Sequence, residues 1–254
     1  MALSKIQSGM GGGQPPTQQR ITATGNWTKP ANCTKVKVTV IGGGGGSGGC
    51  HVRPGGGGNH HSAGGGGAAG GCAIKLIDVS GLADGATVSV TIGNGGTAGN
   101  DTPGVGGTGG TSSFGSYCSA TGGVGGSPAG PSTGVANGSY IGSGNAGGIG
   151  SNGDINLRGQ EGKIYQGNAP MSMVHGEQAH LICCYGGVSY LNNAIHPTTG
   201  FFSSDSTIAG IHGVANTGNG GTGALVMMTG NNTTRKSSGA NGGTGIVIVD
   251  EFYS

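Results

Sequence analysis

The stretch Lys35-Val-Lys-Val-Thr-Val-Ile41, followed by five consecutive glycines from Gly42 to Gly46, decides the fold of this chain. Alternation of polar and β-branched apolar residues is typical of a strand with one buried face. A reversed junction closes the chain, where Gly242-Gly-Thr-Gly245 leads into Ile246-Val-Ile-Val249. Predicted strands therefore bracket the glycine-rich sequence, which is unexpected for a disordered linker.

Glycine dominates the composition: 65 of the 254 residues are glycine, while 8% are charged and the formal net charge is +2. Disordered chains usually carry high net charge and few β-branched residues, so plain disorder is disfavoured. The glycines keep no strict three-residue period and proline is scarce, which excludes collagen. Apolar residues make up 33% of the chain, so most of it must pack without a large apolar core.

The predicted secondary structure consists of strands alone. No apolar 3.6-residue period lasts three turns without a glycine, so no helix is expected and the fold class is all-β. Residues 1–20 are predicted to be an N-terminal attachment arm or linker, and residues 21–254 a single glycine-rich domain. Within it, residues 154–199 hold only 6 glycines in 46 residues and form a glycine-poor insertion that is a candidate recognition segment. Besides 35–41, strands are predicted at 21–28, 72–79, 87–92, 179–185, 187–191, 224–228 and 246–252.

Glycine runs can be ordered if their backbones hydrogen-bond to one another. A polyproline-II-like helix has three residues per turn and no internal hydrogen bonds, so its N–H and C=O groups must find partners in neighbouring chains. Without Cβ atoms, such helices can approach closely enough to bond on all sides. The run 42–49 would extend about 25 Å, and the bracketing strands would start the lattice. We therefore expect a bundle of polyglycine-II helices.

Motifs for cofactors and catalysis lack their structural context. Gly44–Gly49 satisfies G-x-G-x-x-G after a strand, but no helix follows and no acidic residue occurs between 50 and 77, so no cofactor is expected. Two G-x-S-x-G matches, at 45–49 and 130–134, also lack a following helix. No carboxylate pair is suggested by spacing. The chain is predicted not to be an enzyme.

Histidines and cysteines follow no established metal-ligand spacing. His51, His60 and His61 are expected to be solvent-exposed in loops, and His175 and His180 are five residues apart rather than four. No metal site is predicted. The six cysteines show no repeated spacing, and the chain starts without the apolar segment of a secretory signal, so reduced, partly buried thiols are expected.

The charge and hydropathy of the chain give no support for two classes of partner. A net charge of +2 does not indicate binding to nucleic acid. No stretch approaches the ~20 apolar residues that span a bilayer, so no membrane insertion is expected.

Aromatic residues are few, so their positions are informative. Two interpretations are open for Tyr185, Tyr190, Phe201 and Phe202, which lie in or beside the glycine-poor segment: they fill a small core, or they form an adaptable recognition surface. Candidate receptor-binding residues are Tyr185, Tyr190, His196, Phe201, Phe202, His60 and His61.

The order of these elements resembles a glycine-rich domain that is common in phage tail-fibre proteins. In that domain a tryptophan-bearing strand, here with Trp27, precedes a proline turn, here Pro30, and then a K-V-x-V-x-V strand enters a glycine run. Later segments of the chain also resemble those of that domain, and the resemblance covers about residues 21–254 except for 154–199. It implies a small β-sandwich that carries polyglycine-II helices, with variable loops at the tips that bind host receptors in related tail-tip adhesins.

The function implied by this resemblance is that of a virion tail-fibre or tail-tip protein, assembled in the host cytoplasm. It would bind a host-cell surface receptor, either a protein or a glycan, without catalysis. It would contact other tail or fibre proteins through residues 1–20 and would form a homotrimer. One alternative is a purely structural virion component, such as a fibre shaft or capsid decoration. A polysaccharide depolymerase would need an acidic pair in a groove.

Overall fold

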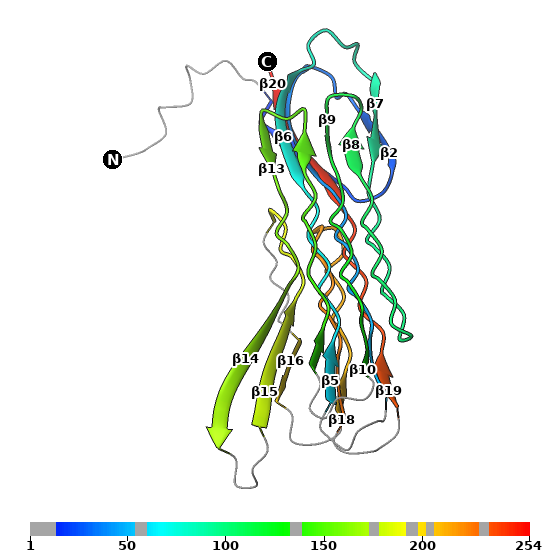
Figure 1. The fold of residues 1–254 in the computed structure, drawn as a ribbon. Helices are drawn as coiled ribbons and strands as arrows, with labels where there is room; N and C mark the ends of the chain where they lie inside the picture. Colours follow the sequence, from blue (N-terminus) through cyan, green and yellow to red (C-terminus); the bar gives the residue numbers. More distant parts are fainter. Residues whose placement is uncertain are drawn as a thin grey trace, which may run out of the picture.

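The computed structural model describes residues 14–53, 60–132, 139–172, 178–191, 198–201, 206–228 and 234–254. All regular structure in these ranges is β, which confirms the predicted all-β class. No described residue belongs to a helix that could cross a membrane. Figure 1 shows an elongated molecule, with a pair of sheets at one end, long irregular segments in the middle and further strands at the opposite end.

Two five-stranded sheets pack face to face as a β-sandwich. The first sheet has the strand order β1 (Thr17–Ile21), β20 (Ile246–Tyr253), β3 (Cys33–Ile41), β6 (Cys72–Asp78) and β13 (Ile155–Leu157). The second has the order β12 (Gly150–Ser151), β9 (Cys118–Ala120), β8 (Ser112–Phe114), β7 (Thr87–Thr91) and β2 (Gly25–Thr28). All pairings within these two sheets are antiparallel.

The sandwich core is small and is built from both sheets. Val36, Val38 and Val40, which alternate along β3, are fully buried, as the period of two predicts. Trp27 of β2 is also fully buried, and its ring centroid lies 5.7 Å from that of Phe114. The alternating sequence of β3 therefore forms one wall of the core, and aromatic side chains of the second sheet fill the space opposite.

A buried carboxylate joins the two sheets. Glu251 of β20 is 2% exposed, and its Oε1 accepts a hydrogen bond from Trp27 Nε1 at 2.8 Å. Gln19 Nε2 donates to the same oxygen at 2.7 Å, and the hydroxyls of Thr17 and Tyr253 donate to Oε2. A buried carboxylate is stable only when its oxygens are hydrogen-bonded, and these four donors provide that.

The glycine segments between the two ends of the molecule are hydrogen-bonded to one another. All eight N–H groups of residues 42–49 donate to carbonyls of other segments, at N···O distances of 2.8–3.1 Å. Successive N–H groups donate in turn to carbonyls of three neighbouring segments, which are residues 65–71, 104–110 and 240–243. Every third donor, beginning with Gly43, returns to 104–110. This period of three equals the three residues per turn of a polyproline-II-like chain.

The carbonyl groups of this central segment are paired as well. Carbonyls at 43–47 and 49 accept N–H groups of residues 96–99, 123–129 and Gly221, at 2.8–3.0 Å. Residues 42–49 are therefore surrounded by six neighbouring segments. Backbone groups in the interior of the bundle find their partners in other segments, as burial of a backbone requires.

The close approach of these segments leaves no space for side chains. An ideal Cβ placed at any of the seven glycines of 42–49 would lie 1.8–2.4 Å from a backbone carbonyl oxygen. The exception is Ser47, which is fully buried and whose Oγ accepts the N–H of Ala240 at 2.6 Å. Glycine is thus required here by packing, since main chains rather than side chains form the interior.

Three small sheets form the end of the molecule away from the sandwich, which we call the distal end (Figure 1). One has the order β10 (Ala129–Ser132), β4 (Cys50–Val52) and β19 (Arg235–Ser237). A second has the order β11 (Ser139–Ile141), β5 (His60–Ala63), β18 (Leu225–Met228) and β17 (Ser206–Ile208). The third has the order β14 (Lys163–Ser172), β15 (Gln178–Tyr185) and β16 (Thr198–Phe201).

Several sequence predictions need correction. The region 21–28 is not one strand: β1 and β2 are separate and lie in different sheets. Residues 17–20, assigned above to the arm, belong to β1 and pair with β20, while residues 1–13 lie outside the described residues. Residues 187–191 form no strand, because their backbone bonds to the bundle, with Gly187 N–H donating to the carbonyl of Gly67 at 2.8 Å.

The six cysteines are free thiols, and five of them are buried. Burial raises the pKa of Cys50 and of Cys72 to about 12 and that of Cys118 to about 11. These thiols therefore stay protonated at neutral pH and behave as small apolar side chains. Cys184 is fully buried and its pKa is raised for the same reason.

Candidate functional site

The distal end has its own apolar cores, which hold its short strands in place. All four residues of β18 are buried, because the side chains on its two faces pack against different apolar clusters. Val226 and Met228 contact Cys50 and Val52 of β4. Leu225 and Met227 instead pack with Ala63 of β5 and Cys184 of β15. A single apolar strand therefore joins the three distal sheets.

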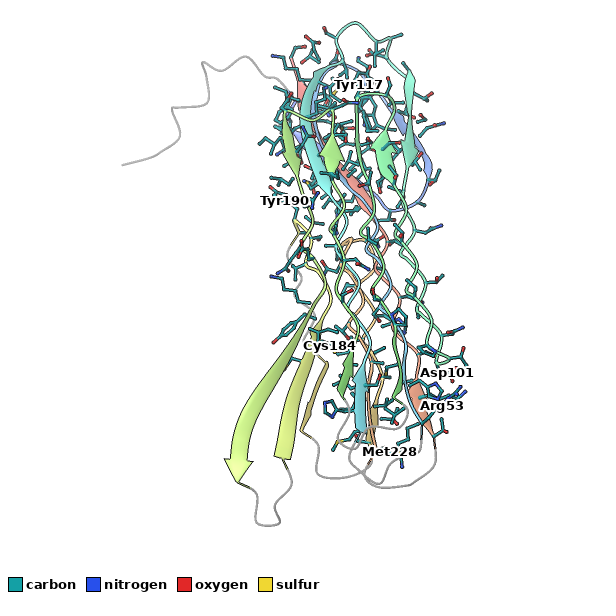
Figure 2. The ribbon with its side chains drawn as sticks, in the orientation of Figure 1. Arg53, Asp101, Tyr117, Cys184, Tyr190 and Met228 are labelled. Carbon is teal, nitrogen blue, oxygen red and sulfur yellow. The ribbon has the colours of Figure 1, made fainter. Side chains whose placement is uncertain are left out.

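Charged side chains gather on the outer part of this scaffold. Lys236 of β19 forms an ion pair with Asp101, with Nζ and Oδ2 2.8 Å apart. Lys236 lies directly opposite His51 in the pairing of β19 with β4, and Arg53, at the end of β4, is exposed. Figure 2 shows Arg53 and Asp101 near one another, far from Tyr117 in the sandwich. We call Arg53, Asp101, Arg235 and Lys236 the distal charged cluster.

His51 lies beside this cluster, opposite Lys236 on the neighbouring strand. It is 6% exposed, and neither ring nitrogen has a hydrogen-bond partner among the described residues. Its pKa is lowered, first by burial and then by the positive charges of Arg53 and Lys236, against a smaller opposing effect of Asp101. The imidazole is therefore neutral at pH 7, and the positive charge of this surface is carried by Arg53 and the residues of β19.

This arrangement suits recognition of polar or anionic groups. Two exposed basic side chains, Arg53 and Lys236, can donate charge-assisted hydrogen bonds. A rigid scaffold reduces the entropy lost when such side chains are ordered on binding. Among the residues that the structure describes, no three histidine, cysteine or acidic side chains are grouped so as to hold a metal ion.

The structure separates the residues predicted as receptor contacts. Tyr190 is 52% exposed, but it lies along the side of the bundle. Tyr185 ends β15 and is half-buried. His61 is 3% exposed in β5, between β11 and β18, so the expected exposed loop position is wrong for it, and the same holds for His51.

The other candidates are described in part or not at all. Phe201 and His60 belong to β16 and β5, but their side chains lie outside the described residues. His196 and Phe202 lie outside the described residues altogether. No group of the predicted contacts therefore forms a single surface in the described part of the chain.

Sequence reasoning missed the distal charged cluster. Its members are far apart in the chain, at 53, 101 and 235–236, and only the fold brings them to one end. A signal was present, because Arg235-Lys236 is the one pair of adjacent basic residues in the sequence and follows a polar interruption of the glycine-rich region. Pairing of β19 with β4, which depends on the bundle, could not be read from that signal.

The fold and the distal surface define a protein class: a β-sandwich that extends a hydrogen-bonded bundle of glycine segments toward a polar end. The chain belongs to the glycine-rich domain family, whose model matches residues 17–251. The match begins at the first residue of β1 and ends within β20, so it spans the sandwich, the bundle and the distal end. No curated protein matches the chain.

Proposed function

We propose that the protein is a virion tail-fibre or tail-tip component that binds a host-cell surface receptor at its distal end, without catalysis. The observation that carries this proposal is that the two ends of the molecule differ. The first described strand β1 and the last strand β20 pair with each other in the sandwich, at the end opposite the distal charged cluster (Figure 1). Attachment at the sandwich would leave the distal end pointing outward.

The arrangement of the described distal strands also supports a distal recognition surface. Strands β4 and β5, β10 and β11, β14 and β15, and β18 and β19 are consecutive in the chain, and each pair ends at the distal side (Figure 1). A rigid scaffold lowers the entropic cost of binding at the strand ends that it positions. The glycine bundle supplies such a scaffold, because its interior backbone groups are hydrogen-bonded to neighbouring segments.

The proposal is tested by binding of the purified, fluorescently labelled protein to host cells and by its competition with infection. Charge reversal at the distal end, by Arg53→Glu together with Lys236→Glu, is expected to weaken cell binding at least tenfold. The matched control reverses two exposed basic residues of the sandwich, by Arg20→Glu together with Lys35→Glu, and should bind as the unmodified protein does.

Two results would contradict the proposal. One is the absence of cell binding by a folded sample, which would favour the alternative of a purely structural virion component. The other is equal loss of binding in the distal and the sandwich variants, which would indicate non-specific attraction between basic residues and the cell surface. Thermal unfolding of each variant, followed by circular dichroism, verifies that the compared samples are folded.

A further inference from the structure

A pocket of about 210 Å³ opens on the side of the molecule, where the bundle meets the sandwich. One wall is formed by residues 157–160, which begin at the last residue of β13, and the other by residues 188–190. Gly70 and Cys72 complete its lining. Figure 2 shows Tyr190 on this side of the molecule, apart from Arg53 and Asp101 at the distal end.

Both walls are held by hydrogen bonds to buried parts of the bundle. Gln160 accepts the N–H of Val188 on its side-chain Oε1 at 3.1 Å, and its carbonyl accepts the N–H of Ala69 at 2.9 Å. Ser189 N–H donates to Oδ1 of Asn219, which is fully buried, at 2.9 Å. The pocket is therefore formed before any ligand arrives, which lowers the entropic cost of binding.

The chemical groups around the pocket are of three kinds. Tyr190 and Leu157 present apolar surface and are 52% and 36% exposed. Arg158 is exposed, and no described carboxylate forms an ion pair with it. Gln160 is exposed, and its side-chain amide nitrogen is a hydrogen-bond donor.

We propose that this pocket binds one ring of an acidic saccharide. A pyranose ring has an apolar C–H face that packs on a flat aromatic surface such as Tyr190, and its hydroxyls are matched by the side-chain amide of Gln160. A carboxylate on the ring is matched by the guanidinium of Arg158, which can bind both oxygens. The volume lies below the ~300–1,000 Å³ of pockets for drug-sized ligands, which suits a single ring.

Anions without a ring fit the pocket less well. Inorganic phosphate would engage Arg158 but would leave Tyr190 and Leu157 without a contact. A neutral sugar would contact the apolar surface and leave the guanidinium unused. The pocket lies apart from the distal charged cluster, so this inference stands independently of the proposed receptor binding at the distal end.

Ligand-detected NMR titration of the full chain tests the proposal, with glucuronate, galacturonate and N-acetylneuraminate as acidic sugars. At least one of them is expected to bind at least tenfold more tightly than glucose and than inorganic phosphate. Arg158→Gln should reduce its affinity to that of glucose, whereas Tyr190→Ala should abolish binding and Tyr190→Phe, which keeps the ring, should retain it. Arg20→Gln and Val105→Ala, at exposed sites outside the pocket, are the matched controls.

Three outcomes would overturn the proposal: no binding of any acidic sugar to the folded protein, phosphate binding as tight as that of the acidic sugars, or binding that survives both Arg158→Gln and Tyr190→Ala. The exposure of Arg158 and Tyr190 means that these substitutions should leave the fold intact, and thermal unfolding checks this. Because the titration uses soluble sugars, its result is separate from that of the cell-binding experiment.

Discussion

Substitution Gly44→Ala is expected to destabilise the protein by at least about 3 kcal/mol, toward the severe end of overpacking effects. The added Cβ would lie 1.9 Å from the carbonyl oxygen of Asn219 and 2.3 Å from its carbon. Neither main chain can withdraw easily, because Gly44 N–H is bonded to Gly243 and its carbonyl accepts from Gly96. Denaturant unfolding, followed by circular dichroism, measures the loss.

The matched controls are Gly25→Ala and Gly81→Ala, where an added Cβ would meet no atom within 4 Å. Alanine at a compatible glycine position usually stabilises by about 0.4–1 kcal/mol, because it restricts the unfolded chain. We therefore expect these two variants to be at least as stable as the unmodified protein. A Gly44→Ala variant as stable as the controls would show that residue 44 is not packed against Asn219.

Substitution Glu251→Leu is expected to cost about 2–4 kcal/mol, because hydrogen bonds to a charged group are lost and a buried donor is left without an acceptor. Trp27 Nε1 donates to Glu251 Oε1 at 2.8 Å in the sandwich core. Leucine is of similar size but accepts no hydrogen bond from the indole or from Gln19. Guanidinium unfolding, followed by the fluorescence of Trp27, the only tryptophan in the chain, measures the change.

The neighbouring carboxylate provides the control for Glu251. Asp250 pairs with Lys37, with Oδ2 and Nζ 2.9 Å apart, but the lysine side chain is 50% exposed. Exposed ion pairs contribute about 0–1 kcal/mol, so Asp250→Leu should cost no more than about 1 kcal/mol. Equal losses in the two variants would mean that the connection between Trp27 and Glu251 does not stabilise the sandwich.

The sandwich strands could largely be predicted from the sequence, because their pattern is local. β3, β6, β7 and β20 are five or more residues long, and over such a length a period of two is visible in β3 and β7. Trp27, in the segment 21–28 that was predicted to be extended, is fully buried. The break between β1 and β2 was not predicted, because Thr24 makes a long-range contact, in which its Oγ1 accepts the N–H of Ile92.

The distal strands could not be predicted, because their partners come from distant parts of the chain. β4 and β19 have three residues each and are 180 or more positions apart, so neither shows a period. His51 and His61 were expected in exposed loops, but they occupy the central strands β4 and β5 of their sheets and are buried between neighbours. The glycine bundle, which sets the positions of these strands, carries no side-chain pattern.

The claim that the glycine segments form the packed interior of the molecule is tested most directly by hydrogen–deuterium exchange of residues 42–49. Each N–H of this segment is hydrogen-bonded to another segment, so its exchange requires unfolding of the bundle. Mass spectrometry of peptides that cover 42–49 should show protection as strong as that of β3. Exchange as fast as in an unstructured peptide of the same sequence would contradict this account.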